Sequence, residues 1–82
     1  MYFVYVLQSD VDKTFYVGRS AEIENRVNEH NTGRVSYTKR KMPWRLVYYE
    51  AYSSWDAAKE REDQLKRFGS SYTGLMKRLK LK

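Results

Sequence analysis

The carboxylate of Glu62 falls on a helix stripe that should be apolar, which makes it the first candidate for chemistry. Residues 55–68 have the spacing of an amphipathic helix. At about 100° per residue, one arc of about 80° holds Trp55, Ala58, Glu62 and Leu65. A carboxylate that faces a core costs free energy unless a cation neutralises it. Glu62 is therefore predicted to bind a metal ion or a basic side chain.

A second helical stretch, residues 21–31, repeats this anomaly with positive charge. Here an arc of about 100° holds Ile23, Arg26, Val27 and His30. A guanidinium can bind two phosphate oxygens at once and stays charged at any working pH. An imidazole titrates near neutrality. Two helices that turn charged groups toward a shared sheet indicate a polar site.

The length and composition exclude several classes of protein. Eighty-two residues make one domain, residues 1–82, with a small core. The absence of cysteine excludes disulfides and thiolate zinc sites, and a single histidine excludes a multi-histidine metal site. A metal site would be open and oxygen-based, which favours Mg²⁺ or Mn²⁺. Neither a membrane span nor a signal peptide is evident, so we expect a soluble, cytoplasmic protein without a membrane partner.

The net charge of the whole chain is +6, and positive charge is concentrated in its second part. Residues 1–33 carry three Lys or Arg and five Asp or Glu, whereas residues 34–82 carry thirteen and five. The first block without acids contains Arg34, Lys39, Arg40, Lys41 and Arg45. The second contains Lys66, Arg67, Lys77, Arg78, Lys80 and Lys82. These blocks predict a polyanionic partner such as nucleic acid. A merely solubilising surface is the alternative.

The elements that must position these residues follow from local patterns. Residues 2–7 and 14–18 are aromatic and β-branched and predict a hairpin with a loop of about five residues. Ser20 is predicted to cap the first helix and Gly33 to end it. Residues 44–52 predict a third strand, and Ser54 caps a helix that ends near Gly69. A basic third helix is expected at about residues 70–80. The order β-β-α-β-α-α predicts an α+β fold, a three-stranded antiparallel sheet flanked by three helices.

An ordered set of short motifs extends over nearly the whole chain. Phe3-Val4-Tyr5 is followed by Tyr16-Val17-Gly18, Arg26, the segment His30-Asn31-Thr32-Gly33, Tyr37-Thr38, residues 46–50 and residues 61–66. This pattern resembles the GIY-YIG nuclease superfamily, in particular its small stand-alone branch, from Tyr2 to about Leu79. Phe3 replaces the glycine of the first motif.

The resemblance implies a metal-dependent endonuclease that hydrolyses phosphodiester bonds in DNA with one Mg²⁺ or Mn²⁺ ion. By position, it implies that Tyr5, Tyr16, Arg26, His30 and Glu62 are catalytic, with Glu62 as the metal ligand. Arg19 lies where some members have a lysine after the second motif. Larger members append DNA-binding domains that this chain lacks, so we expect weak sequence specificity or selection of substrate structure, in repair or recombination.

The chemistry suits these residue types. Tyr5 or Tyr16 could orient or deprotonate a water molecule if a neighbouring cation favoured the phenolate. His30 could shuttle a proton or hydrogen-bond a tyrosine. Simpler roles are packing for the tyrosines and helix capping for His30. Arg26 could instead pair with Glu62 or Glu29, and with Arg26 alone Glu62 could be inert.

Sequence-independent phosphate contacts are expected from Arg19, Arg34, Lys39, Arg40, Lys41 and Arg45. Tyr37 and Trp44 could stack on bases, although Trp44 also suits a core position. The alternative function is a non-catalytic nucleic-acid-binding module that keeps the nuclease fold. A third is a domain that docks on a larger repair protein. A homodimer, which would help to cut both strands, is left open.

Overall fold

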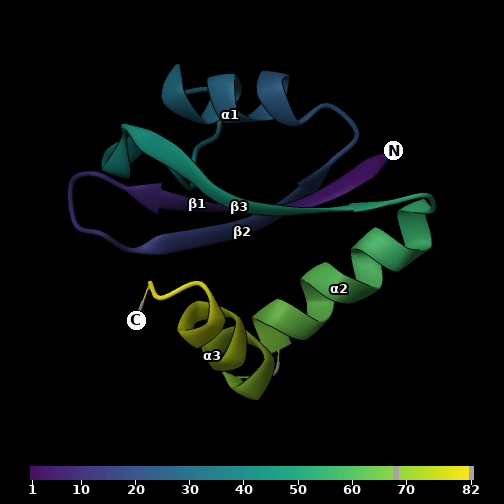
Figure 1. Cartoon of the computed structure of the whole chain (residues 1–82). Coiled ribbons are helices and arrows are strands. Elements are labelled where there is room, and N and C mark those ends of the chain that lie inside the picture. The colour runs from purple at the N-terminus through teal and green to yellow at the C-terminus, as the bar shows by residue number, and fades with distance from the viewer. Residues whose placement is uncertain (68, 82) are drawn as a thin grey trace.

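A computed structural model of the protein describes residues 1–67 and 69–81. Its strands are β1 (Tyr2–Ser9), β2 (Phe15–Ser20) and β3 (Trp44–Tyr52). Its helices are α1 (Ile23–Asn31), α2 (Trp55–Arg67) and α3 (Gly69–Arg78), with a short 3₁₀ turn at Lys39–Lys41. The predicted α+β order is confirmed (Figure 1). None of the described helices has the length and hydropathy needed to cross a bilayer.

Strand β1 is the centre of the sheet, whose order is β2-β1-β3 with antiparallel pairing throughout. Its segment Val4–Leu7 is buried, as expected for β-branched and aromatic residues on a central strand. Tyr5 pairs with Gly18 of β2 on one side and with Tyr49 of β3 on the other. Strands β2 and β3 are therefore the two edges of the sheet.

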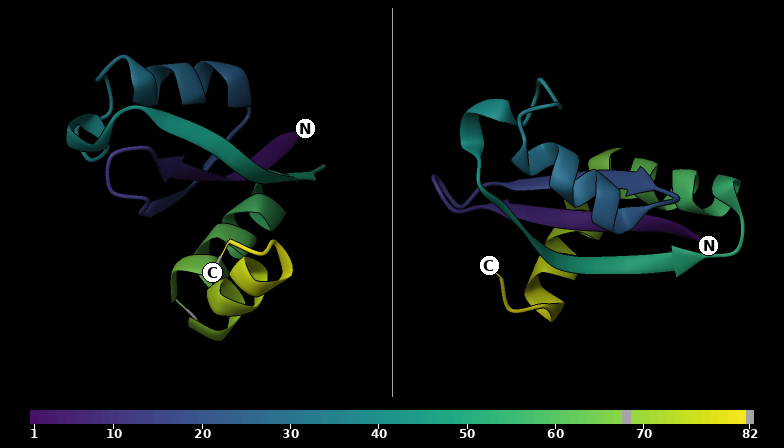
Figure 2. Two further views of the ribbon diagram at one scale, coloured as in Figure 1. Left: turned by 60° about the vertical axis from the view of Figure 1, so that its left-hand side comes forward. Right: turned by 90° about the horizontal axis from the view of Figure 1, so that it is seen from above.

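Helices cover both faces of the sheet, with α1 on one face and α2 and α3 on the other (Figures 1 and 2). The alternation of β1 side chains divides the core accordingly. Tyr5, Leu7 and Trp44 pack with residues of α1. The opposite face holds Val4, Val6, Val17, Ala58, Leu65, Leu75 and Met76. The two helices that carry the inward charges thus lie on opposite sides of one sheet.

Two of the predicted helix signals are confirmed, whereas the predicted start of α1 is not. The Ser54 hydroxyl accepts a hydrogen bond from the Ala57 amide at 3.0 Å and caps α2. Gly33 follows α1 with a φ of 79°, a conformation that glycine adopts readily. The predicted cap by Ser20 is wrong, because Ser20 is the last residue of β2. Its hydroxyl bonds to Glu22 in the connecting turn, and α1 begins at Ile23.

The predicted inward stripe of α2 is confirmed for Ala58, Glu62 and Leu65, which are buried. Trp55 lies on the same face of the helix but is 41% exposed, so it is not a core residue. Trp55 is the first residue of the helix, and its ring packs edge-on against the Tyr2 ring at 5.4 Å. Phe68, at the end of the predicted helix, and Lys82, in the second basic block, lie outside the described residues.

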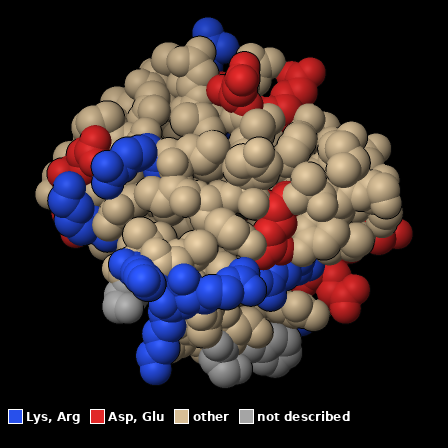
Figure 3. Space-filling view, viewed as in Figure 1, with Lys and Arg blue, Asp and Glu red and all other residues tan. Residues whose placement is uncertain are grey.

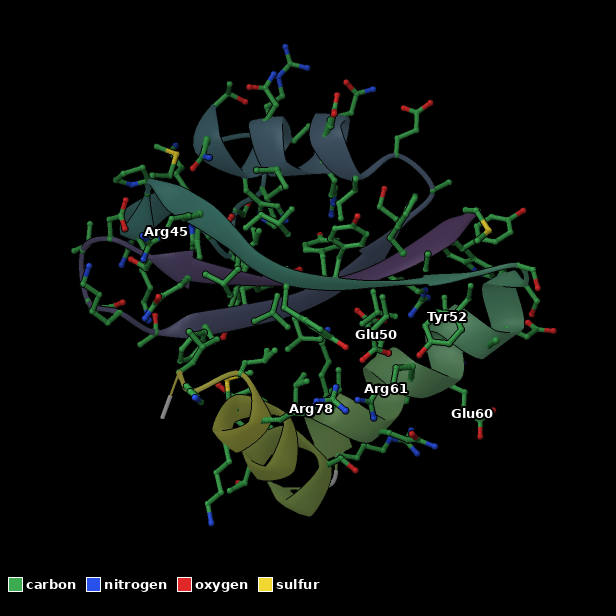
Figure 4. The ribbon with its side chains drawn as sticks, viewed as in Figure 1. Arg45, Glu50, Tyr52, Glu60, Arg61 and Arg78 are labelled. Carbon is green, nitrogen blue, oxygen red and sulfur yellow. The ribbon has the colours of Figure 1, made fainter. Side chains whose placement is uncertain are left out.

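Helix α2 is fastened to β3 by a polar cluster around Glu50 (Figure 4). The Glu50 carboxylate accepts hydrogen bonds from Arg61 at 3.0–3.2 Å, from Tyr48 at 2.7 Å and from Tyr52. Arg78 of α3 donates to the Tyr48 hydroxyl at 3.3 Å. Burial opposes ionisation of Glu50, but the hydrogen bonds outweigh burial and lower its pKa. The cluster therefore sets where α2 lies across the sheet.

Replacing Glu50 with glutamine should lower the free energy of unfolding by about 1–3 kcal/mol, because Arg61 loses a charged acceptor in a partly buried place. Glu60 provides the matched control. It is exposed on α2, the helix that contains Arg61, and its side chain points away from the cluster (Figure 4). Glu60→Gln should change stability by less than about 0.5 kcal/mol. Urea unfolding of both variants measures the difference, and equal losses would contradict an anchoring role for Glu50.

Candidate active site

An open hollow of about 420 Å³ lies at the β2 edge of the sheet. Its walls come from β1, β2, α1 and α2, and its lining residues are Tyr5, Tyr16, Gly18, Arg19, Arg26, Trp55, Glu62 and Lys66. The structure thus brings together four of the five residues predicted to be catalytic, and adds Arg19. The fifth, His30, is fully buried behind Tyr5. Residues that lie between positions 5 and 66 of the sequence therefore surround one concavity.

Gly18 permits the Tyr5 phenol to reach the hollow. A Cβ atom at Gly18 would lie 2.5 Å from the Tyr5 hydroxyl oxygen and 2.6 Å from its ring carbon Cζ. It would also lie 3.1 Å from the Tyr16 ring. These contacts are shorter than van der Waals separation, so any side chain at position 18 would displace a tyrosine. The glycine of the second motif is required by this close approach.

A buried chain of hydrogen bonds fixes Tyr5. Its hydroxyl lies 3.0 Å from His30 Nε2, and His30 Nδ1 lies 2.7 Å from the Thr38 hydroxyl. Thr38 donates its own proton to the Val35 carbonyl at 3.3 Å, so its oxygen accepts the proton of His30 Nδ1. His30 Nε2 is then the acceptor of the Tyr5 hydroxyl proton. The predicted contact between His30 and a tyrosine is confirmed.

The protonation of this chain follows from its burial. Burial, reinforced by the nearby Arg26 charge, lowers the pKa of His30 to about 4, so the imidazole is neutral. Burial also raises the pKa of Tyr5 to about 12, although Arg26 acts in the opposite direction. Arg26 thus favours the phenolate of Tyr5, as expected of a neighbouring cation, but desolvation outweighs Arg26 and the phenol stays protonated.

Arg26 lies on the hollow beside the Tyr5 hydroxyl. Its Nη1 atom is 3.4 Å from the Glu29 carboxylate, one turn along α1. Burial lowers the pKa of Arg26, but Tyr5 and Glu29 outweigh it and the net shift is upward, so the guanidinium is charged. The alternative in which Arg26 pairs with Glu29 is confirmed as a contact. With a half-buried side chain, Arg26 keeps donors directed at the hollow.

Glu62 is neutralised by two other cations. Arg19 Nη1 donates to Oε1 of Glu62, and Lys66 Nζ lies 3.1 Å from Oε2. The alternative that Arg26 alone pairs with Glu62 is therefore wrong. Arg19 belongs to β2 and faces α2, whereas Arg26 approaches from α1 on the opposite face of the sheet. The prediction that an inward carboxylate needs a cation is confirmed.

Arg19 is only partly satisfied. Its guanidinium carbon lies 5.0 Å from the centre of the Trp55 ring, a cation–π contact. Among the described residues, its Nε is the buried side-chain nitrogen that has no hydrogen-bond partner. An unpaired buried donor costs on the order of 1–3 kcal/mol. Arg19 is therefore held in the site by charge and stacking more than by a complete set of acceptors.

Tyr16 joins the hollow to the connection between α1 and β3. Its ring centre lies 4.8 Å from that of His30 and 5.8 Å from that of Tyr37. Tyr37 is 81% exposed, so one face of an aromatic pair is open beside the hollow. Trp44 is buried and donates its indole proton to the Thr38 carbonyl. The suggestion that Trp44 stacks on bases is wrong, and its core position is confirmed.

The first basic block divides into free and engaged side chains. Arg34, Lys39 and Arg40 are exposed along the connection that carries Tyr37. Lys41 lies 3.2 Å from the Asp12 carboxylate in the hairpin loop, and Arg45 donates to the Gln8 side chain at 3.3 Å. The exposed residues thus lie on both sides of Tyr37, whose ring contacts that of Tyr16, whereas Arg45 belongs to the opposite edge strand.

A second basic surface lies beside β3. In Figure 3, Lys and Arg side chains form a band below this strand, over α2 and α3. Arg61 and Arg78, labelled in Figure 4, lie in this region. The hollow is at β2, the other edge of the sheet. Positive charge is therefore not confined to the candidate site.

Thr38 and Lys66 belong to this site but were not assigned to it from the sequence. Thr38 sets the His30 tautomer, but it lies in an irregular connection where no periodicity indicates which way a side chain points. Lys66 lines the hollow, and its spacing of four residues from Glu62 was an available signal, because such residues are neighbours on a helix.

The hollow contains one side chain that could bind a hard divalent ion. Glu62 is the carboxylate on its wall, and oxygen ligands suit Mg²⁺ or Mn²⁺. No cluster of three or more His, Cys, Asp or Glu side chains suited to a metal occurs within residues 1–67 and 69–81. Glu62 would hold such an ion, and water or substrate would supply the other ligands, as is common for Mg²⁺.

Comparison with known families agrees with the geometry. Residues 1–78 match the GIY-YIG catalytic domain. The chain belongs to the GIY-YIG family. This GIY-YIG chain is 40% identical to a UPF0213 protein of Syntrophus aciditrophicus over 67 residues, which are 79% of this chain and 76% of that protein. It is 41% identical to a UPF0213 protein of Natronomonas pharaonis over 66 residues, which are again 79% of this chain and 76% of that protein.

A solved structure supports the same assignment. The solution NMR structure of a UPF0213 protein from Bacillus halodurans is similar, with a TM-score of 0.59 and 28% identity. The match covers 98% of this GIY-YIG chain and 86% of that chain. The predicted membership is confirmed, and the domain has a nuclease fold. The names of these relatives state no activity.

Gly18→Ala should destabilise this GIY-YIG domain by about 1–3 kcal/mol, because the new methyl group overlaps the Tyr5 phenol. Gly74→Ala is the matched control, since nothing lies within 4 Å of a Cβ at this helical position. It should be neutral or stabilising by up to about 1 kcal/mol. Thermal unfolding reports both, and near-ultraviolet circular dichroism reports the tyrosine environment. Equal effects of the two substitutions would refute the close-approach argument.

The low pKa of His30 predicts a specific acid sensitivity. Because the pKa is about 4 in the folded state against an ordinary 6.5, the unfolded chain takes up the proton first. The stability contributed by neutral His30 is complete above pH 6.5 and is lost as the pH falls toward 4. The loss should approach about 1.4 kcal/mol per pH unit within that range.

His30→Gln should remove this part of the pH dependence. Denaturant unfolding between pH 7 and pH 4 should give a shallower decline for the variant than for the wild type, whatever its stability at pH 7. The carboxylates, including Glu50, are common to both proteins and cancel in the difference. Parallel curves would show that His30 titrates normally in the folded protein.

Proposed function

We propose that this protein is a metal-dependent endonuclease that hydrolyses phosphodiester bonds in DNA, with weak sequence specificity or selectivity for substrate structure. A role in repair or recombination is part of the proposal. The observation that carries it is the convergence of Tyr5, Tyr16, Arg26 and Glu62 from four elements on one open hollow. Packing alone gives no reason for phenols, a guanidinium and a carboxylate to share such a surface.

Arg26 is assigned to the phosphate. Its guanidinium faces the hollow, stays charged and can donate to two oxygens of one phosphate group. Negative charge grows on those oxygens as a water molecule attacks the phosphorus. A fixed cation at this place stabilises the transition state more than the ground state.

Tyr5 and His30 are assigned to proton transfer. The Tyr5 oxygen can accept a proton from the attacking water while the hydroxyl proton passes to His30 Nε2, 3.0 Å away. This route needs no stable phenolate, which agrees with the raised pKa of Tyr5. Neutral His30, oriented by Thr38, has its lone pair directed at Tyr5. Tyr16, whose ring centre lies 6.4 Å from that of Tyr5, is assigned to orienting the water.

Glu62 is assigned to the metal ion. A bound Mg²⁺ or Mn²⁺ would neutralise charge and polarise the phosphoryl group. Glu62 would hold it through an anionic oxygen, and the hollow is wide enough for water and phosphate as further ligands.

The exposed connection is assigned to nucleic-acid binding. Arg34, Lys39 and Arg40 would contact backbone phosphates in any sequence, with Arg19, Lys41 and Arg45 as further contacts. Tyr37, exposed beside Tyr16, would stack on an unpaired base. This arrangement favours single-stranded or distorted DNA next to the scissile bond.

A non-catalytic binding module is the second candidate. The observation that favours it is the pairing of both Glu62 oxygens with cations, which satisfies the carboxylate without metal. The same basic connection would then bind nucleic acid without turnover.

Cleavage of labelled duplex, single-stranded and branched DNA distinguishes the two candidates. Wild type should give products with Mg²⁺ or Mn²⁺ and none with EDTA. Glu62→Gln, which keeps the shape of the side chain, should lower the rate by at least about a hundredfold. Glu60→Gln removes an exposed carboxylate two residues away and should leave the rate unchanged.

Equal cleavage by wild type and Glu62→Gln would reject the proposed site and indicate a contaminating nuclease. Salt-sensitive binding by wild type without cleavage under any metal would favour the binding module.

A further inference from the structure

Two basic side chains pair with the Glu62 carboxylate, which the proposed function assigns to metal binding. Arg19 holds one oxygen of Glu62, and Lys66 holds the other at 3.1 Å. The Glu62 side chain is only 9% exposed, so solvent screens the three charges weakly. A divalent ion that binds Glu62 must take an oxygen from at least one of these cations, since a third positive group at the same carboxylate would repel both.

Lys66 is the cation better able to leave. Its side chain is 48% exposed, whereas that of Arg19 is 26% exposed and stacks on Trp55. The lysine stem is flexible and its ammonium is a point charge without a fixed geometry. Breaking the Lys66 contact therefore costs less than removing Arg19 from its stacked position.

A displaced Lys66 would remain on the wall of the hollow. Its Nζ atom lies 5.8 Å from the centre of the Tyr16 ring, on the surface that also presents Arg26 and Tyr5. A phosphate group in the hollow would give the ammonium a new anionic partner. Phosphate and metal therefore favour each other's binding. The phosphate pairs with the displaced Lys66, and the metal ion neutralises the Glu62 carboxylate that Lys66 has left.

We propose that Lys66 is a phosphate-positioning residue that exchanges partners, pairing with Glu62 in the absence of substrate and with a substrate phosphate when metal binds Glu62. Divalent metal and nucleic acid then bind cooperatively. The inference rests on the proposed function for the metal role of Glu62, and adds a residue and a coupling to it.

The same helix contains a matched ion pair that has no such role. Lys59 Nζ lies 3.7 Å from the Asp63 carboxylate, also at a spacing of four residues. Both side chains of this pair are well exposed, and neither lines the hollow of the candidate site. Lys59→Met therefore removes an ordinary surface pair from α2, whereas Lys66→Met removes the proposed exchange. Methionine keeps the length of the side chain and suits a helix.

Calorimetric titration with Mn²⁺ tests the proposal without relying on activity. Each protein is titrated alone and with a short single strand that has phosphorothioate linkages, which resist hydrolysis. A strand with neutral methylphosphonate linkages is the ligand control. For wild type and Lys59→Met, the charged strand should lower the Mn²⁺ dissociation constant about tenfold. The neutral strand should leave the Mn²⁺ dissociation constant unchanged.

Lys66→Met should bind Mn²⁺ severalfold more tightly than wild type without nucleic acid, and the charged strand should lower its Mn²⁺ dissociation constant by a smaller factor than it does for wild type. Circular dichroism establishes that the variant is folded. Glu62→Gln should show no Mn²⁺ binding at this site. Coupling of the same size in Lys66→Met and wild type would overturn the exchange while leaving the proposed function intact. If Mn²⁺ bound no protein under any condition, the proposed function would fail and the inference with it.

Discussion

The position of the candidate site depends on the burial of charge on α2. Adjacent residues of this helix pair with opposite edges of the sheet: Arg61 with Glu50 of β3, and Glu62 with Arg19 of β2. Each ion pair is partly buried, so leaving one partner unpaired would cost free energy. The helix can therefore neither slide nor rotate without breaking one pair. The apolar residues Ala58 and Leu65 hold α2 against the sheet, but they would tolerate small shifts that the ion pairs do not.

The central strand provides the second constraint. Tyr5 is buried like a core residue, yet its hydroxyl reaches a surface hollow. Both conditions are met because Gly18, its partner on the edge strand, has no side chain. His30 then satisfies the hydroxyl from α1, and Thr38 satisfies His30. A chain of 82 residues cannot enclose a deep pocket, and an edge strand with a glycine opposite a tyrosine gives access without one.

Local patterns predicted what belongs to a single element. The 3.6-residue period placed Glu62 and His30 on inward faces, and both are buried. Contacts between elements were less predictable. Arg26 was an available partner for Glu62, but α1 and α2 cover opposite faces, and no local pattern states which face each helix covers. The helical period placed Trp55 on the correct face of α2, but it does not show that the first residue of the helix is exposed. Thr38 lies in an irregular connection, where neither the helical nor the strand period applies.

The same physical logic explains why a charged site does not unfold so small a domain. Four elements each contribute a charged or polar group to the hollow, and unpaired these groups would repel one another or lose hydration. Within the described residues, Tyr5 belongs to a neutral network with His30 and Thr38, and Arg19, Glu62 and Lys66 form an ionic network. Arg26 pairs with Glu29 outside both networks. The neutral network is buried and can be rigid, because moving a proton along it requires no movement of side chains. The ionic network opens toward solvent at Lys66, where a side chain can move at little cost. Burial thus separates the part of the site that should stay fixed from the part that can rearrange when an anion arrives.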